Sequence, residues 1–431
     1  MAMLRAANEV CMNAAPKIAF VVLAAALGGC GTTIAGAPPG SAGADAWPAR
    51  APDAVPRRNQ FPSTPSGVHL NLVFNYRVPN LRREIGVVDV VWGARSPYPK
   101  RVVNQFYTPF EREGPYGPSH DLHWWKRNHP DWIEYRCNRK SVAFEFGERS
   151  VVPFDIANPA VLAYQRASAV DPALAAGYRG IDFDNLELGN YFHRCGHYAP
   201  DRKWVAQYSG SDTDPRYTGD VIAWAKSTFA YVHALSATAT MAMNFSYDGN
   251  FSAERNDALS AQADEVLAEA GFTNYGAKHH NVTSPREWRQ IVGLIRAIQS
   301  RRGCFMENGE EPALSKDISQ TERLWVVANY LLIRDDCTYV WISGFAASGG
   351  QDYGRILIYP EYGLPIGKPT ADAREVDGAW QREYSGGLAL VNPSHRRVMI
   401  PLKRAYVDEN GRRYRGSIVL GATTGQILLL K

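Results

Sequence analysis

The segment 177–190 carries the densest set of groups able to do acid–base chemistry. A short apolar stretch ends there in three carboxylates, Asp182, Asp184 and Glu187. Because side chains alternate along a strand, Asp182 and Asp184 share one face. Two ionised acids on one face repel each other, and a sequence tolerates this where the charges meet water, a metal or a substrate. The alternative is an acidic turn in which Asp184 or Asn185 caps a following helix.

A second acid occupies a matching place further along the chain. Glu269 ends the apolar segment 263–269 and is followed by aromatic residues, which suits a general acid with a raised pKa. We therefore expect Asp184 to act as nucleophile or base, Glu269 as general acid, and Asp182, one layer deeper, to tune Asp184. The alternatives are a surface salt bridge for Glu269 and a core acid satisfied by backbone for Asp182.

The apolar runs between residues 87 and 344 indicate which elements position these acids. Eight runs read as strands: 87–92, 102–107, 132–135, 180–184, 237–244, 263–269, 324–330 and 339–344. The segment 69–75 is an extra strand or the true first one. Several runs are apolar throughout, as in parallel strands covered on both faces. Helices fit at 159–170, 220–234 and 284–300. This alternation predicts an α/β fold, a (β/α)8 TIM barrel over residues 67–369.

In such a barrel the C-terminal ends of the strands form the functional face. By that rule, the side chains expected to bind substrate are Trp92, Tyr107, Asn185, Asn244, Tyr247, Asp248, Phe272, Tyr275 and Trp341. Two acids on nearby strands, ringed by aromatic and amide side chains, fit glycoside hydrolysis. In that reaction one acid protonates the leaving oxygen, while the other attacks the anomeric carbon or activates water.

The pattern of predicted elements changes after about residue 370. Short β-rich runs follow one another at 387–393, 397–400, 405–414 and 425–430, joined by turns such as Asn392-Pro393. They predict a small C-terminal antiparallel β-domain over residues 370–431.

The first thirty residues read as a leader rather than as part of the fold. An apolar run, 18–27, is too short to span a bilayer comfortably and is followed by Gly28-Gly29-Cys30. This end resembles a bacterial lipobox, so residues 1–30 are expected to be a lipoprotein signal peptide and Cys30 the lipidated residue. The alternatives are an ordinary secretory signal or an uncleaved anchor. Residues 31–66, rich in Gly, Ala, Pro and Ser, predict a flexible tether to a membrane, with the outer membrane, facing periplasm or exterior, as the expected location.

Four cysteines remain beyond the leader: Cys137, Cys195, Cys304 and Cys337. An even number in an oxidising compartment predicts two disulfides with three possible connectivities. We favour Cys137–Cys195 and Cys304–Cys337, because each pair falls on neighbouring parts of the expected barrel. The alternative is four buried free thiols.

No metal or cofactor is expected. The cysteines lack C-x-x-C spacing, and the adjacent pair His279-His280 would point in different directions, which disfavours one shared ion. The sequence contains no phosphate-binding glycine loop, nucleophile elbow or dinucleotide fingerprint. With a net charge of +4 over 431 residues, and basic residues scattered among acidic ones, nothing predicts a nucleic-acid partner. We expect a monomer.

Several segments together resemble a known group of bacterial proteins. They are Trp124-Trp125, 129–132, 152–159, 180–185 and 264–269, and they are similar to TIM-barrel proteins of hypothetical glycosyl hydrolase-like family 15. The segment 387–393 resembles the start of the β-domain that often closes such enzymes. The resemblance covers roughly residues 85–430 and implies the barrel fold and a glycosidase activity, without transferring a catalytic residue.

Two functions follow as hypotheses. The first is an exported, lipid-anchored glycoside hydrolase that cleaves a polysaccharide with two carboxylates. The second is a non-catalytic carbohydrate-binding or envelope-assembly lipoprotein on a degenerate barrel, since a fold does not guarantee an activity. The separation of the two carboxylates discriminates between them, because hydrolysis needs a second acid across a cleft from Asp184.

Overall fold

The fold is taken from a computed structural model. It describes residues 68, 70–72, 88–93, 104–106, 120–145, 152–269, 271–273, 284–311, 315–346, 350–351 and 357–431. The expected signal peptide, the lipidated Cys30 and the tether lie outside these residues. Within the described part of the chain, no helix has both the length and the apolar character needed to cross a bilayer.

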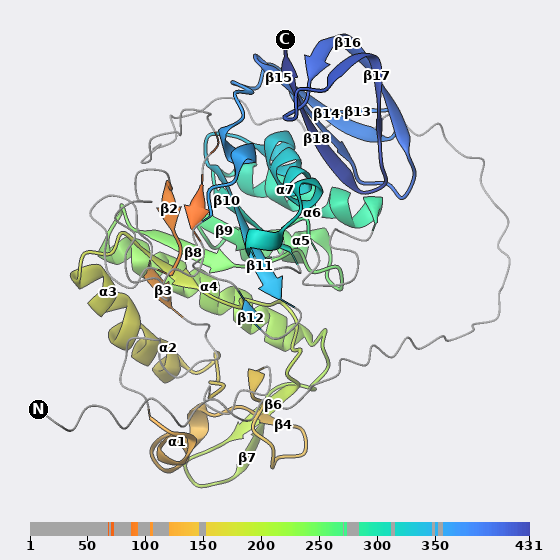
Figure 1. Ribbon diagram of the computed structural model, residues 1–431. Helices are drawn as coiled ribbons and strands as arrows, with labels where there is room; N and C mark the ends of the chain where they lie inside the picture. The colour runs from red at the N-terminus through yellow and green to blue at the C-terminus, as the bar shows by residue number, and fades with distance from the viewer. Residues whose placement is uncertain are drawn as a thin grey trace, which may run out of the picture. The chain divides into compact units, whose positions relative to one another are not determined.

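A parallel sheet forms the centre of the molecule (Figure 1). Its parallel strands follow one another in chain order: β3 (Asn104–Phe106), β5 (Gly180–Phe183), β8 (Thr240–Asn244), β9 (Glu265–Ala268), β10 (Cys304–Glu311) and β11 (Thr338–Ala346). The short β12 (Gly350–Gln351) pairs antiparallel with β11. Every residue of β5 and β9 is buried, which explains their nearly unbroken apolar sequences.

Two further parallel strands adjoin the far side of β11. β1 (Asn71–Leu72) pairs in parallel with β2 (Val90–Val91), and Leu70, just before β1, forms a parallel bridge with Val340 of β11. The segment 69–75 therefore does contain a strand. No ladder joins β2 to β3 among the described residues. The described strands form a parallel sheet of an α/β fold.

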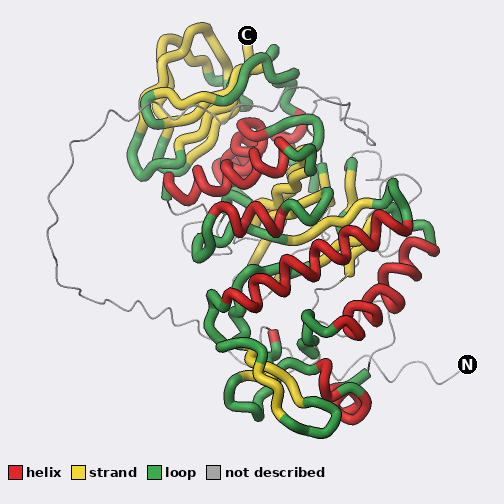
Figure 2. The backbone as a smooth tube through the Cα atoms, turned by 180° about the vertical axis from the view of Figure 1, so that it is seen from behind, coloured by secondary structure: helices red, strands yellow, loops and turns green. Residues whose placement is uncertain are grey.

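Helices lie against this sheet (Figure 2). They are α2 (Pro159–Gln165), continued by a π-helical turn (Arg166–Val170) and by α3 (Asp171–Ala175), then α4 (Pro215–Leu235), α5 (Ala253–Ser260), α6 (Pro285–Ser300) and α7 (Gln320–Ile333). Start signals in the sequence explain their first residues. Ser284 caps α6 ahead of Pro285, and Ser319 and Glu322 form a capping box on α7. The three helices expected from sequence are confirmed within a few residues.

One expected strand is wrong, and one strand was missed. The run 324–330 is helical and lies in α7, and the strand between β9 and β11 is β10, which the sequence did not reveal. Every residue from Leu324 to Ile333 is buried, because α7 contacts β10 and β11 as well as β15 and β18, described below. A helix covered all round has no polar face and hence no helical period to read. β10 was missed because its sequence, CFMENGEE, is rich in polar residues.

The third error concerns 132–135, which contributes to a separate antiparallel sheet. This sheet consists of β4 (Tyr135–Arg136), β6 (Arg194–Tyr198) and β7 (Trp204–Ala206). It joins α1 (Leu122–Asn128) and the 3-10 helix Pro130–Trp132 in a unit with its own core, which we call the disulfide module (Figure 1). Trp125, Ile133 and Phe154 are fully buried there.

Disulfides join Cys137 to Cys195 and Cys304 to Cys337, with Cα–Cα distances of 5.0 and 4.8 Å. These are the two favoured pairs, although the first joins β4 to β6 in the disulfide module rather than two barrel loops. Gly210 packs against the sulfurs of the first bond at a φ of +77°, and a Cβ there would lie 2.7 Å from Cys195 Sγ. Glycine is therefore required at this position.

The C-terminal residues form a six-stranded antiparallel sheet in the order β13-β14-β15-β18-β16-β17. The strands are β13 (Arg374–Val376), β14 (Ala379–Tyr384), β15 (Gly387–Asn392), β16 (Val398–Val407), β17 (Arg413–Leu420) and β18 (Thr424–Leu430). Asp377 and Gly378, both at positive φ, make the tight turn between β13 and β14. Contacts of β15 and β18 with α7 make the sheet continuous with the central core.

Candidate active site

Three strand ends bring two carboxylates together through one amide. Asp184 follows β5, Asn244 ends β8 and Glu269 follows β9, and β8 lies between the other two strands. Asn244 Nδ2 donates hydrogen bonds to Asp184 Oδ1 at 2.7 Å and to Glu269 Oε2 at 2.8 Å. Those two oxygens are therefore at most about 5.5 Å apart, the sum of the two distances. All three side chains are buried to at least nine-tenths.

The backbone after β5 explains how Asp184 is aimed. Asn185 adopts a left-handed conformation with φ of +52°, which Asn tolerates better than most residues. The turn lets the Asn185 N–H donate to Asp184 Oδ1 at 3.0 Å. No helix follows Asp184 and Asn185, since the next element is β6, so neither residue is the helix cap considered from the sequence.

The pKa of Asp184 is raised to about 7, and burial of its carboxyl is the largest cause. The negative charge of Glu269 raises this pKa further, while the hydrogen bonds from Asn244 and Asn185 lower it. The pair therefore holds a proton near neutral pH that neither acid would hold alone in water.

The strand end of Glu269 is supported from the other side. Asn308 of β10 donates from Nδ2 to the Glu269 carbonyl oxygen at 2.9 Å, and Ser343 of β11 donates to Asn308 Oδ1 at 2.8 Å. This chain of bonds ties β9, β10 and β11 at their C-terminal ends. It fixes the backbone from which the Glu269 carboxylate projects.

A cavity of about 230 Å³ opens beside the acid pair. Its lining contains Asn185, Glu187, Tyr191, Asn244, Ser246, Tyr247, Asp248 and Glu269, with Leu186, Leu188, Phe245 and Gly249. Asn185, Asn244, Tyr247 and Asp248 thus lie where the strand-end rule expected substrate-binding side chains. A cavity lined by acids, amides and tyrosines offers many hydrogen bonds to a polyhydroxylated ligand.

The far wall of the cavity is organised around Tyr191, which sequence reasoning did not single out. Tyr191 donates from its hydroxyl to Asp248 Oδ2 at 2.5 Å and accepts from Asn250 Nδ2 at 3.1 Å. Burial raises the pKa of Glu187 to about 8, with Glu145 adding to the effect and Arg194 opposing it.

A buried ion pair lies behind this wall. Arg194 Nη2 donates to Glu145 Oε1 at 2.7 Å, and both side chains are almost fully buried. The charge of Glu145 raises the pKa of Asp184 as well as that of Glu187. No sequence signal pointed to this pair, because 49 residues separate its members.

Asp182 lies below the acid pair and does not line the cavity. It is fully buried, and its Oδ2 accepts a hydrogen bond from the Gly93 N–H at 3.1 Å. Burial raises the pKa of Asp182 well above its ordinary value, and Glu265 and Asp184 add to the shift. Asp182 therefore contacts the backbone beyond β2 and does not line this cavity, and the expectation that it tunes Asp184 stays a prediction.

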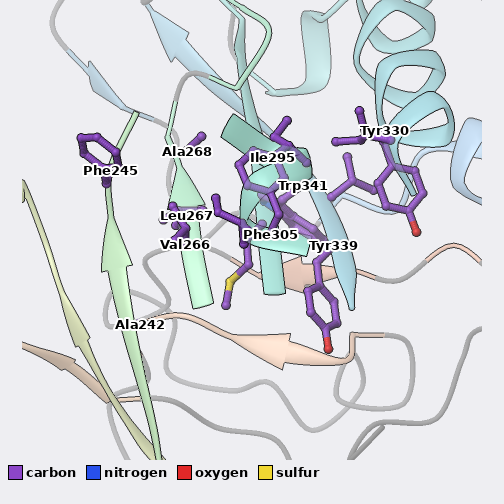
Figure 3. Packing of buried hydrophobic residues seen from close by; sticks show 14 of the residues in the cluster. Ala242, Phe245, Val266, Leu267, Ala268, Ile295, Phe305, Tyr330, Tyr339 and Trp341 are labelled. Carbon is purple, nitrogen blue, oxygen red and sulfur yellow. The ribbon is translucent and has the colours of Figure 1, made fainter. Parts of the chain in front are cut away.

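Three aromatic rings expected to stack on substrate belong to the core. Trp92, Phe272 and Trp341 are at most 1% exposed, and Figure 3 shows Trp341 beside Tyr339 among buried side chains. These rings fill the space around the strand ends, so they have no face open to a ligand. Tyr107, Tyr275 and the pair His279-His280 lie outside the described residues.

The comparisons with known proteins agree with the chemistry of this site. The model of hypothetical glycosyl hydrolase family 15 matches residues 100–388, and the chain belongs to that family, a group of glycoside hydrolases. No curated protein sequence matches the chain.

Solved structures to which the chain is similar at low TM-scores include the following three. The glycoside hydrolase domain of PelA from Pseudomonas aeruginosa is 16% identical, with 66% of this chain and 95% of that chain covered and a TM-score of 0.39. An α-amylase from Malbranchea cinnamomea is 10% identical, with 76% and 74% covered and a TM-score of 0.41. The maltogenic α-amylase AmyB from Thermotoga neapolitana is 10% identical, with 85% and 99% covered and a TM-score of 0.44.

Proposed function

We propose that this chain hydrolyses glycosidic bonds of a polysaccharide with Asp184 and Glu269 as its two carboxylates. The observation that carries the proposal is the shared Asn244 amide, which joins Asp184 to Glu269. Asn244 and Glu269 line the polar cavity, and Asp184 lies directly behind Asn244, bonded to its amide. Family membership supplies the reaction class, and the paired acids supply the groups that this class requires.

The acid separation favours retention of anomeric configuration. Retaining enzymes place their carboxyl groups about 5–5.5 Å apart, whereas inverting enzymes need about 6.5–9.5 Å to admit a water. The upper limit of about 5.5 Å between the Asp184 and Glu269 oxygens joined by Asn244 Nδ2 lies below the inverting range, which supports the shorter spacing. A water between these acids and the anomeric carbon would have too little room, so a covalent intermediate is the better fit.

The raised pKa of Asp184 assigns the two roles in the opposite sense to the sequence expectation. With a pKa of about 7, Asp184 is mostly protonated below that pH, which suits the general acid that protonates the leaving oxygen. Glu269 attacks the anomeric carbon, and the bond to the leaving sugar breaks. Water then attacks the glycosyl–Glu269 ester while Asp184 accepts its proton, which restores both carboxyls.

A screen for reducing-end release over bacterial polysaccharides tests the proposal. The wild-type chain is expected to release reducing ends from at least one of them, and Asp184→Asn is expected not to. Proton NMR of the first product should show the anomer of the substrate. Binding of a polysaccharide without release would instead support the alternative, a non-catalytic carbohydrate-binding protein, and an inverted first product would contradict the covalent route.

We also propose that the parallel strands close into a (β/α)8 barrel. From β3 to β11 and on through β1 to β2, eight parallel strands follow one another around the sheet. The bond from Gly93, just beyond β2, to Asp182 of β5, the strand beside β3, supports this closure. An experimental structure in which β2 and β3 lie apart would contradict closure.

Lipid anchoring through Cys30 is the proposed means of export and retention. It is supported by the segment Leu27-Gly-Gly-Cys30 after an apolar run and by the polar tether that follows. We place the mature protein at the bacterial outer membrane. Mass spectrometry of the mature N-terminus should find lipid on Cys30, and Cys30→Ser should release the protein from membranes. An unlipidated N-terminus cleaved elsewhere would contradict the anchor.

A further inference from the structure

A second group of ionisable side chains lies in the disulfide module, apart from the cavity. Glu134, Asp155 and His197 each bring one ligand atom to within 4.8 Å of the others. They come from separate segments that the backbone binds together, since the Glu134 N–H donates to the Pro153 carbonyl and the Asp155 N–H donates to the Trp132 carbonyl. None of the three lines the cavity beside Asp184.

The distances suit a common ion. His197 Nδ1 lies 3.3 Å from Asp155 Oδ2 and 3.1 Å from Gln207 Oε1. Atoms that each bind one Zn²⁺ at about 2.0–2.1 Å stand roughly 2.8–3.4 Å apart, from the edge of an octahedron to that of a tetrahedron. Both distances from His197 Nδ1 fall in this range, while Gln207 Nε2 donates to Asp155 Oδ2 at 2.8 Å. Glu134 completes a set of four.

Glu134 is the observation that points to a ligand. Its side chain is 1% exposed, and neither carboxylate oxygen has a donor in hydrogen-bond geometry, although the Gly196 N–H is near enough to favour the ionised form. An isolated buried carboxylate is costly. Arg194 is close to it but is engaged by Glu145 at 2.7 Å. Glu134 and Glu145 thus share one guanidinium, while Asp155 pairs with His197. This leaves one uncompensated negative charge beside Asp155 and His197, which a divalent cation would neutralise.

We propose that Glu134, Asp155 and His197 bind a divalent transition-metal ion, with Gln207 Oε1 as fourth ligand. An imidazole nitrogen with carboxylate oxygens suits Zn²⁺, whereas Ca²⁺ and Mg²⁺ take oxygen ligands. The ion would join the segments before β4, before α2 and on β6, beside the Cys137–Cys195 bond. The ion would hold the disulfide module together. This inference does not depend on the hydrolysis proposed above.

The competing metal-free state has a proton on Glu134. Burial raises the pKa of Glu134 to about 8, with Asp155 adding to the effect, so a protonated Glu134 beside Asp155 is available near neutral pH. The two states differ in a measurable way. If Glu134 is protonated and no metal binds, Glu134→Gln and the wild type have the same Zn²⁺ affinity. If Glu134 is a metal ligand, the Zn²⁺ affinity of Glu134→Gln is lower.

The test measures bound metal in the full chain. Wild-type protein is stripped with EDTA, dialysed against ZnSO4 and then against buffer, and its zinc is counted by plasma mass spectrometry. We expect about one equivalent, a higher melting temperature with Zn²⁺ than with EDTA, and at least a tenfold weaker Zn²⁺ affinity for Glu134→Gln and His197→Gln. His193→Gln is the matched control, because His193 Nδ1 also lies 3.4 Å from a carboxylate, that of Asp212, but on the exposed surface.

Less than a tenth of an equivalent in the wild type would overturn the proposal, whatever the variants do. Equal Zn²⁺ affinity in the wild type and Glu134→Gln would also overturn it, in favour of the protonated state. If His197→Gln fails to fold, Glu134→Gln decides, because the amide has the shape of the protonated acid.

Discussion

Asn244 connects the two acids, so its amide should set the pH range in which they work. Its hydrogen bond lowers the pKa of Asp184 against the raising effects of burial and Glu269. Asn244→Ala is therefore expected to raise this pKa and to move the alkaline limb of the pH–rate profile upward, with kcat lowered by about ten- to a hundredfold. The measurement is the profile of the variant beside Asn250→Ala, whose amide donates to Tyr191 instead. An alkaline limb at the same pH as in the wild type would contradict an effect of Asn244 on the pKa of Asp184.

The raised pKa of Asp184 also predicts how stability varies with pH. From the ordinary value of 3.8 to about 7, the unfolded chain loses this proton while the folded chain keeps it. The contribution of Asp184 is thus fully present below pH of about 4 and lost as pH rises through about 7. Relative to Asp184→Asn, the wild type should become less stable across this window and then level off. Urea denaturation at several pH values measures the difference, and a constant difference would contradict the raised pKa.

The positions of the two acids could be predicted because the ends of apolar strands can be recognised in the sequence. Asp184, Asn244 and Glu269 each close an apolar run, and parallel strands align such ends at one edge. The ion pair of Glu145 and Arg194 has no such sequence signal, because residues distant in the chain come into contact only after folding. Aromatic residues misled for a physical reason: Trp, Phe and Tyr fill the core around strand ends as readily as they line a cleft.

At the scale of elements, the sequence revealed parallel strands better than their neighbours. Strands β5, β8, β9 and β11 were found because they are apolar and β-rich. The helix α7 was taken for a strand because burial on all sides removes the pattern that distinguishes the two. β4 was placed in the barrel because a two-residue strand says nothing about which sheet it joins.

The Cys137–Cys195 bond should stabilise the disulfide module strongly. It closes a loop with a sequence separation of 58, and the corresponding loss of unfolded-chain entropy is about 4 kcal/mol. Replacing both cysteines with Ser is expected to lower the free energy of unfolding by roughly that amount and to loosen the wall that Arg194 supports. Urea denaturation gives the first value, and limited proteolysis locates the loosening.

The matched comparison is the double Ser variant of Cys304 and Cys337. That bond closes a shorter loop, of separation 33, between the N-terminal ends of β10 and β11. It should cost a similar free energy without exposing the disulfide module to protease. Equal protease sensitivity of residues 120–210 in both variants would contradict a local role for Cys137–Cys195.

At the scale of the whole molecule, the C-terminal sheet is expected to be required for folding. Arg382 of β14 donates from Nη1 to the carbonyls of Leu331, Leu332 and Arg334 at the end of α7, and Tyr384 donates to Leu331 as well. These bonds satisfy carbonyls that a helix end leaves open. The sheet also covers the apolar side of α7 that faces away from β10 and β11.

Deleting residues 370–431 should therefore give an insoluble or molten chain, because α7 would expose a fully apolar face. Solubility, near-UV circular dichroism and cooperativity of unfolding check this, with Met399→Ser as a control on an exposed position of the same sheet. A soluble truncated chain that unfolds cooperatively would show that residues 67–369 form an independent domain.

Initial rates of reducing-end release test the two-carboxylate site most directly. On a polysaccharide that the wild type cleaves, Asp184→Asn and Glu269→Gln are each expected to lower kcat by about a thousandfold or more while keeping the wild-type circular dichroism spectrum. Asp201→Asn, which removes an exposed carboxylate paired with Lys203, should keep the wild-type rate. A rate near that of the wild type in either Asp184→Asn or Glu269→Gln would contradict the account.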